Sequence, residues 1–241
     1  MRNVWIIARR EFRHYFVSPL AYAVLTMVFL ILGGIFFINI YVGMQMGGIS
    51  PDGRIVIQPL VTILLFATPA LTMRLLADEQ RMGTMELLLT APVRDWELVV
   101  GKWLGSFFFM LLILATTWIY PFILDLMTDP GIDQGMLVSA YVGLTFMVAS
   151  MLAMGVLISS LFKNQVPAFF ATLGLLLFLW ILGGFAGSGG NPVTRYLSFL
   201  GHFYDNLFRG VLHLTDLIYY LSLTILALFL GTQAVEARRW R

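Results

Sequence analysis

The chain has 241 residues, of which 59% are hydrophobic and 12% are charged, and its mean hydropathy is +0.87. A soluble domain carries about 25% charged residues, so this chain has too few charges to cover a surface exposed to water. The absence of cysteine excludes disulfide frameworks and thiolate metal sites, and a net charge of +2 is too small to indicate nucleic acid as a partner. The composition therefore predicts an integral membrane protein, and the length suits one domain over residues 1–241.

The N-terminal residues 1–18 contain the amphipathic stretch VWIIARREFRHYF, which predicts a helix lying in the membrane interface. The alternative is that the basic residues only flank the first span. The first apolar run, residues 15–51, is too long for a cleavable signal peptide and indicates a retained span. The apolar residues that can face lipid are Trp5, Ile6, Phe12 and Phe16, and the basic residues that stay in water are Arg9, Arg10 and Arg13.

Six stretches free of Lys, Arg, Asp and Glu predict six transmembrane helices and an all-α fold. A helix needs about 20 apolar residues to cross roughly 30 Å of hydrocarbon. A charge at its centre costs about 2.5–3.5 kcal/mol on the insertion scale. The predicted spans are residues 20–42, 56–73, 103–124, 137–161, 167–187 and 217–235.

The fourth and fifth spans are separated by a short turn. Lys163 is the only charge between Asp133 and Arg195, and that stretch is too long for one crossing. The sequence KNQVP supplies three polar residues and then Pro167, which suits the start of the next helix. Pro59 and Pro69 are expected to kink the second span, and Pro121 the third. Gly101 with Gly105, and Ala149 with Ala153, allow close helix approach.

The basic residues are distributed unequally over the two sides, which predicts that both termini are cytoplasmic. An even number of spans agrees with this. The other side holds only Arg54, Arg195 and Arg209. The predicted cytoplasmic basic residues are Arg2, Arg9, Arg10, Arg13, Arg74, Arg81, Arg94, Lys102, Lys163, Arg238, Arg239 and Arg241.

The outer segment, residues 187–215, follows a GSGGNP run and carries apolar residues at helical spacing. We expect short helices that enter the outer leaflet and turn back before the sixth span. The alternative is a seventh span, which would break the charge topology. His202 is interpreted as a packing residue, and Asp125 and Asp216 as interfacial charges at outer span ends.

The sequence lacks the signatures of several chemistries. It contains no G-x-x-x-x-G-K-[ST] phosphate loop, no H-E-x-x-H and no G-x-S-x-G. No carboxylate sits in the middle of a span, where a proton relay would need one. The sequence therefore predicts no catalytic residues, no metal site and no cofactor bound by this chain.

The predicted cytoplasmic loop, residues 74–102, contains a run of leucines that forms an exposed apolar knob unless something covers it. Exposed apolar patches usually mark contact surfaces, although the knob could instead pack under the bundle. Within this loop, EQRMGTMELLLTAP resembles the E-x-x-x-G-T-x-E-x-L-L-x-x-P segment of ABC-2 export permeases. The resemblance extends over the whole chain, and HFYDNLFRGVLHLTDLIYY is similar to the gliding-motility permease subfamily.

The resemblance implies that residues 78–98 carry a coupling helix, which sits in a cleft of a separate ATPase subunit. ATP and Mg would bind that ATPase, and two permease chains would form one transporter in the bacterial inner membrane, surrounded by lipid. The short turn SSLFKNQVP offers little surface for a second ATPase contact. The residues implied in coupling are Glu79, Gly83, Thr84, Glu86, Leu87, Leu88, Pro92, Lys163 and Asn164.

The substrate path is expected between two permease copies, near the second and fifth spans, with Thr62, Phe66 and Trp180 along it. Such a lining points to an amphipathic or lipid-like cargo. The main alternative function is a membrane substrate-binding subunit of an energy-coupling importer. Such a subunit lacks the GTMELL loop that this chain has. A lipid-modifying enzyme would need clustered His, Asp or Glu residues, and a channel would show a filter or a charged ring.

Overall fold

The computed structural model describes residues 2–45, 52–83, 93–129, 131–186 and 196–239. These residues are nearly all helical and contain no strand, which confirms the predicted all-α class. The helices are α1 (Arg2–Val17), α2 (Pro19–Gln45), α3 (Arg54–Thr72), α4 (Ala77–Arg81), α6 (Asp95–Thr117), α7 (Ile119–Met127), α8 (Gln134–Leu161), α9 (Gln165–Ala186), α11 (Gly201–Tyr204), the 3-10 helix η1 (Leu207–Arg209) and α12 (Leu214–Arg239).

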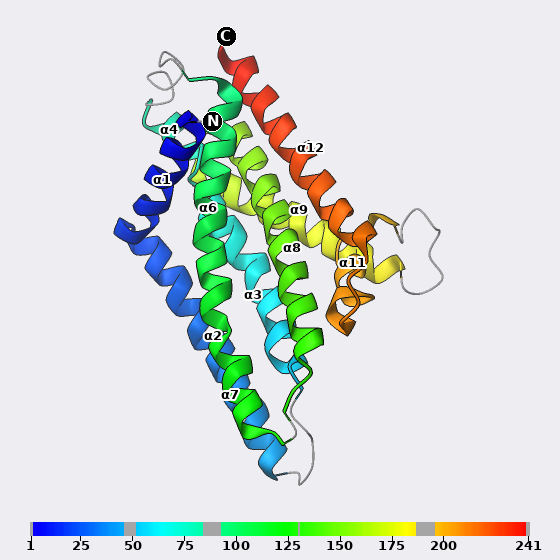
Figure 1. Ribbon diagram of the computed structural model, residues 1–241. Helices are drawn as coiled ribbons and strands as arrows, with labels where there is room; N and C mark the ends of the chain where they lie inside the picture. Colours follow the sequence, from blue (N-terminus) through cyan, green and yellow to red (C-terminus); the bar gives the residue numbers. More distant parts are fainter. Residues whose placement is uncertain (1, 46–51, 84–92, 130, 187–195, 240–241) are drawn as a thin grey trace.

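Six helical segments of the described residues are long and apolar enough to cross a membrane, which confirms the number and order of the predicted spans. Both chain termini lie at one end of the bundle, here called the terminal end, together with α1 and α4 (Figure 1). The predicted turn at Lys163 is confirmed, since α8 ends at Leu161 and α9 begins at Gln165. The candidate spans are Pro19–Gln45, Arg54–Arg81, Asp95–Met127, Gln134–Leu161, Gln165–Gly183 and Leu214–Arg238.

The helix of the third span begins earlier than predicted. α6 starts at Asp95, so the second part of the predicted 74–102 loop is helical, and Lys102 lies inside the helix rather than in the loop. Glu97 accepts a hydrogen bond from the backbone N–H of Arg94 at 3.1 Å, which stabilises the helix start. α6 also packs against α1, and its residues Glu97, Leu98, Val99, Gly101 and Lys102 are buried, although Trp96 stays exposed.

Of the three expected proline effects, that of Pro121 appears as an interruption between α6 and α7 at Trp118, whereas α3 runs as one helix through Pro59 and Pro69. A proline ring collides with the carbonyl four residues earlier, here that of Thr117, and the proline lacks an N–H to bond it. The Thr117 hydroxyl hydrogen-bonds the carbonyl of Leu114 at 2.7 Å and meets the Tyr141 hydroxyl at 3.1 Å. The break is therefore held against α8 by a side-chain contact.

α3 and α8 form the centre of the bundle and are its most buried spans, whereas α2 and α9 are its most exposed. A Cβ added at Gly155 of α8 would collide with the side chain of Thr72 on α3, so the two backbones lie close together. α12 packs along α8, and α9 crosses the bundle obliquely (Figure 1). This core places the ends of α3 and α8 next to each other at the terminal end.

α1 is packed against α6 through the glycine pair that the sequence analysis identified. A Cβ at Gly101 would lie 2.8 Å from Ile7, and one at Gly105 would lie 2.6 Å from Glu11 Cβ and 2.9 Å from the carbonyl of Ala8. Only glycine permits this approach. The opposite faces of α1 leave Trp5 exposed, together with the basic residues.

The outer segment forms short helices, as predicted, and residues 196–213 contain no seventh span. α11 and η1 pack on α8, where a Cβ at Gly143 would lie 2.9 Å from Leu207. Gly210 ends η1 with a φ of 89°, which favours glycine. Residues 187–195 lie outside the described residues.

Candidate functional site

The candidate site lies at the terminal end, where α4 follows the end of α3 (Figure 1). α4 has only five residues and is anchored by Ser159 of α8. The Ser159 hydroxyl accepts hydrogen bonds from the backbone N–H groups of Leu76 and Ala77, both at 3.1 Å. It also donates to the carbonyl of Met73 at 3.3 Å. One buried hydroxyl thus fixes the junction between α3 and α4 on α8.

A second anchor ties α4 to the turn between α8 and α9. The Gln80 side-chain amide donates to the carbonyl of Ser160 at 3.0 Å, and the Gln165 amide donates to the Asp78 carboxylate. Lys163 and Asn164 are exposed in the turn beside this contact. The structure therefore brings two regions together that the resemblance implied in partner contact, the turn and the entrance to the loop.

A triad of charged side chains joins α4 to α1 and α6. Lys102 Nζ of α6 lies 2.8 Å from Glu79 Oε1 of α4 and 3.2 Å from Glu11 Oε2 of α1. The three side chains are only 6%, 12% and 13% exposed, respectively. The resemblance implied Glu79 in coupling to a partner ATPase, whereas the structure pairs its carboxylate with Lys102 of the same chain. Removing Lys102 would leave two buried carboxylates without a cation, which is strongly destabilising.

The loop leaves α4 through Gly83, whose φ of 71° is in the left-handed region. A Cβ at this position meets nothing within 4 Å, so the requirement for glycine is set by the backbone alone. Gly83 therefore makes a left-handed turn where the chain leaves α4. Five predicted site residues lie outside the described residues, namely Thr84, Glu86, Leu87, Leu88 and Pro92.

The chain enters α6 at a second fixed point. Glu97 accepts hydrogen bonds from the Arg94 backbone N–H and, at 3.0 Å, from the side-chain amide of Asn3 on α1. Glu97 is buried, although it lies in the first turn of the helix. Residues 84–92 thus connect two positions that are both held on the bundle.

The three residues predicted along a substrate path lie on α3 and α9. Thr62 and Trp180 line a common groove with Leu65, Met151 and Leu176. Phe66 lies one turn further along the same face of α3 and is 41% exposed, but it does not line this groove. The structure therefore brings two of the three residues together.

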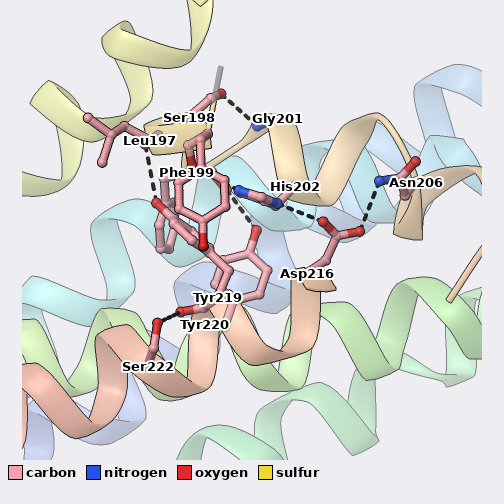
Figure 2. Close-up of polar contacts among 11 residues, drawn as sticks. Leu197, Ser198, Phe199, Gly201, His202, Asn206, Asp216, Tyr219, Tyr220 and Ser222 are labelled. Carbon is pink, nitrogen blue, oxygen red and sulfur yellow. Dashed lines mark hydrogen bonds and ion pairs between the residues drawn. The ribbon is translucent and has the colours of Figure 1, made fainter. Parts of the chain in front are cut away.

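The outer segment contains a polar cluster that sequence reasoning missed (Figure 2). Asp216 is not an interfacial charge as expected, because it is only 3% exposed and its carboxylate meets His202 Nδ1 at 2.6 Å. The carboxylate also accepts from the Asn206 amide at 2.9 Å. His202 Nε2 donates to the carbonyl of Tyr196 at 2.9 Å, and the ring stacks on Tyr219. The cluster fastens residues 196–206 to the first turn of α12.

One signal in the sequence pointed to this cluster, a carboxylate in the first turn of an apolar span with a histidine 14 residues before it. Lys102 had a comparable signal, because it is a lone cation between Gly101 and Gly105, the glycine pair that permits close helix packing. Ser159, Asp78 and Gln165 had none, because polar residues near a span end are common.

The fold defines a polytopic helical membrane protein with a loop anchored at both ends on the side of its termini. The family model of the ABC-2 family transporter protein matches residues 5–237, so the chain belongs to the ABC-2 family. It is a membrane permease subunit of an ABC transporter, of a kind that generally lacks its own ATPase and works with an ABC ATPase subunit. A search of curated proteins found no match for this chain.

Proposed function

We propose that this chain is the permease half of an ATP-driven exporter of the gliding-motility type, and that residues 84–92 dock on a separate ATPase subunit. The observation that carries the proposal is the double anchoring of this loop on the bundle, by α4 on one side and by the start of α6 on the other. Because α4 and the start of α6 are both held on the bundle, a displacement of residues 84–92 would be passed to the spanning helices. The family match favours this function over a substrate-binding subunit of an energy-coupling importer.

Movement of the loop would reach the spans by three routes. Ser159 couples α4 to α8, and the Gln165–Asp78 contact couples it to α9. The Lys102 triad couples α4 to α6 and α1. Closure of two ATPase subunits around ATP and Mg would therefore shift these helices together and change access to the path between two permease copies.

The exposed turn with Lys163 and Asn164 provides a second, smaller docking surface in this proposal. It is joined to α4 through the Gln80–Ser160 contact, so one ATPase surface can touch both. Shape fit of the leucines in the loop would dominate the affinity, because an exposed charge pair contributes only about 0–1 kcal/mol.

The proposed substrate path lies between two copies of the chain or between this chain and a homologue. Thr62 and Phe66 are exposed on one face of α3, and Trp180 of α9 lies beside Thr62. An exposed hydroxyl and aromatic rings on spanning helices suit an amphipathic or lipid-like cargo. In this arrangement α3 and α9 face the second permease.

The proposed orientation puts the terminal end in the cytoplasm and the protein in the bacterial inner membrane. α1, α4 and the end of α12 carry seven of the 15 Lys and Arg residues, and Arg74, Arg94, Lys102 and Lys163 lie at the same end. The positive-inside rule therefore assigns that end to the cytoplasm. Arg54 and Arg209 lie toward the opposite end, where Arg54 pairs with Asp52 and stacks on Phe208.

The docking proposal is tested by co-purifying the chain with its ATPase subunit and measuring ATP-driven transport. Leu88→Asp is expected to abolish transport and to weaken ATPase retention about tenfold or more, because it places a charge in an apolar contact. The matched control is Val211→Asp, an exposed apolar position of the outer segment, which is expected to retain the ATPase. Full transport by Leu88→Asp would contradict the proposal.

Orientation is tested separately with single cysteines, since the natural sequence has none. Lys163→Cys in whole cells is expected to resist a membrane-impermeant maleimide, whereas Asp205→Cys is expected to react. Both positions are exposed in the structure. The reverse labelling pattern would show that the terminal end is outside, and ATPase docking at the loop would then be impossible.

A further inference from the structure

The strongest unassigned feature is a cavity of about 550 Å³ at the terminal end, between α1, the end of α3, α4 and α6. Its lining includes Arg10 and Arg13 of α1 and Arg74 at the end of α3. It is distinct from the residues 84–92 that the proposed function uses. The cavity opens beside the junction of α1 and α2, where Val17 lines it and is 80% exposed.

Arg74 is the unusual residue of this cavity. One guanidinium nitrogen donates to the hydroxyl of Ser18, and the guanidinium lies 5.4 Å from the ring centroid of Tyr15. Its Nε and second terminal nitrogen are buried and have no hydrogen-bond partner among the described residues. Arginine stays charged in proteins, so these N–H groups require an acceptor, ideally an anionic one.

The carboxylates that line the cavity bind other residues and do not form ion pairs with Arg74. Glu11 and Glu79 pair with Lys102, and Asp78 accepts from Gln165. No ion pair among the described residues involves Arg10, Arg13 or Arg74.

The Tyr15 hydroxyl does not supply a negative charge either. Burial, together with the nearby Glu11 carboxylate, raises the pKa of the Tyr15 phenol far above its usual range, so the phenol stays neutral. Four cationic side chains and three carboxylates line the cavity, which leaves a surplus positive charge beside the unsatisfied nitrogens of Arg74.

We propose that this cavity binds a phosphate group through Arg74, with Arg10 and Arg13 at its rim, and that the phosphate is that of an anionic phospholipid headgroup. Planar guanidinium groups bind phosphate oxygens through paired hydrogen bonds. Ser18 immediately precedes the spanning helix α2 and Arg74 follows the end of α3, so both lie where a spanning segment meets the headgroups. The exposed Val17, Phe16 and Tyr22 beside the cavity offer an apolar surface for acyl chains.

This site would connect lipid binding to the anchor of the loop, since α1, α4 and α6 meet both the cavity and the Lys102 triad. The inference does not depend on the proposed ATPase docking, because it concerns only contacts between this chain and the bilayer. An acidic group of a partner protein is the competing occupant. The headgroup is favoured by the position of Arg74 at span ends and by the apolar surface next to it.

The test uses the purified full chain, reconstituted in bilayers containing equal amounts of phosphatidylglycerol and phosphatidylcholine. Lipid retained after mild detergent extraction is quantified by mass spectrometry. The natural chain is expected to retain phosphatidylglycerol preferentially, and Arg74→Gln to reduce that preference about tenfold, as expected for lost charge-assisted hydrogen bonds. Arg9→Gln also removes one positive charge, but from a position on α1 that does not line the cavity. This control is expected to leave the preference for phosphatidylglycerol unchanged.

Two further measurements distinguish a lipid phosphate from free inorganic phosphate and show whether the variants are folded. Excess inorganic phosphate that displaces phosphatidylglycerol supports the phosphate site; binding of inorganic phosphate without lipid preference assigns it to free phosphate and overturns the lipid assignment. Phosphatidylglycerol is expected to raise the thermal midpoint of the natural chain but not of Arg74→Gln. If Arg74→Gln fails to fold, Arg13→Gln at the rim replaces it, with an expected loss of about threefold.

The proposal is overturned if the natural chain shows no preference for phosphatidylglycerol and binds no inorganic phosphate. It is also overturned if Arg9→Gln reduces the preference as much as Arg74→Gln, because that result indicates general charge attraction. If Arg74→Gln retains lipid normally but binds the ATPase subunit more weakly, the cavity holds an acidic group of that partner instead.

Discussion

The ammonium group of Lys102 lies 2.8 Å from the carboxylate of Glu79, which places a cation of the third span against the short helix that follows the second span. Glu11 of α1 completes the arrangement from the other side. The contact makes α4 part of the bundle rather than a free extension of the loop. Four experiments test this arrangement and its counterpart in the outer segment.

Lys102→Met is expected to destabilise the protein by about 3–5 kcal/mol, because it leaves the Glu11 and Glu79 carboxylates buried without their cation. Unfolding in a denaturing detergent titration measures this. Lys163→Met is the matched control at an exposed position and is expected to change stability by less than about 0.5 kcal/mol. Adding Glu11→Gln and Glu79→Gln to Lys102→Met should recover much of the loss; no recovery would mean that the triad does not act as a unit.

Gly83→Ala is expected to cost about 1 kcal/mol locally, because alanine is disfavoured at a φ of 71°. The methyl group itself meets nothing within 4 Å, so the effect comes from the backbone alone. Gly34→Ala is the control. A Cβ at Gly34 also has no atom within 4 Å, and the helical backbone at this position accepts alanine. Hydrogen exchange of the α4 amides should increase in the first variant only. Equal exchange in both would argue against a strained turn at Gly83.

Gly105→Ala is expected to loosen α1 from α6, since its Cβ would lie 2.6 Å from Glu11 Cβ and 2.9 Å from the Ala8 carbonyl. Neither atom can move away without shifting the α1 backbone. Hydrogen exchange should rise throughout α1, which reports its opening from the bundle. Gly174→Ala on α9 meets nothing within 4 Å and should leave α1 protected. Unchanged protection of α1 in Gly105→Ala would show that α1 is held mainly elsewhere.

Asp216→Ala is expected to destabilise the protein by about 2–3 kcal/mol, because His202 and Asn206 lose their common acceptor. Both ring nitrogens of His202 face oxygen acceptors, so its orientation depends on the carboxylate. Asp205→Ala removes a neighbouring exposed carboxylate and should have little effect. Thermal unfolding and hydrogen exchange of residues 196–206 provide the measurements. Normal protection of these residues in Asp216→Ala would contradict an anchoring role for the cluster.

Local signals predicted the spans and several backbone features. The turn at Lys163, the interruption caused by Pro121 and the close approach at Gly101 each depend on one residue and its immediate neighbours. The helix of the third span was not expected to include residues 95–102, because this extension depends on contacts with α1. The burial of Asp216 was not expected either, because it depends on contacts with the outer segment.

Hydropathy and charge along the chain are enough to predict six helices that can cross a membrane, because each charge-free stretch of sufficient length avoids the cost of burying charge in hydrocarbon. The sequence also determined the family, through residues that lie along most of the chain. Which charges are buried, and which partners they have, follows from how the helices pack. Lys102, Glu79 and Glu11 read as separate polar residues along the chain, and only the packing of α1, α4 and α6 brings their charges close enough to offset desolvation.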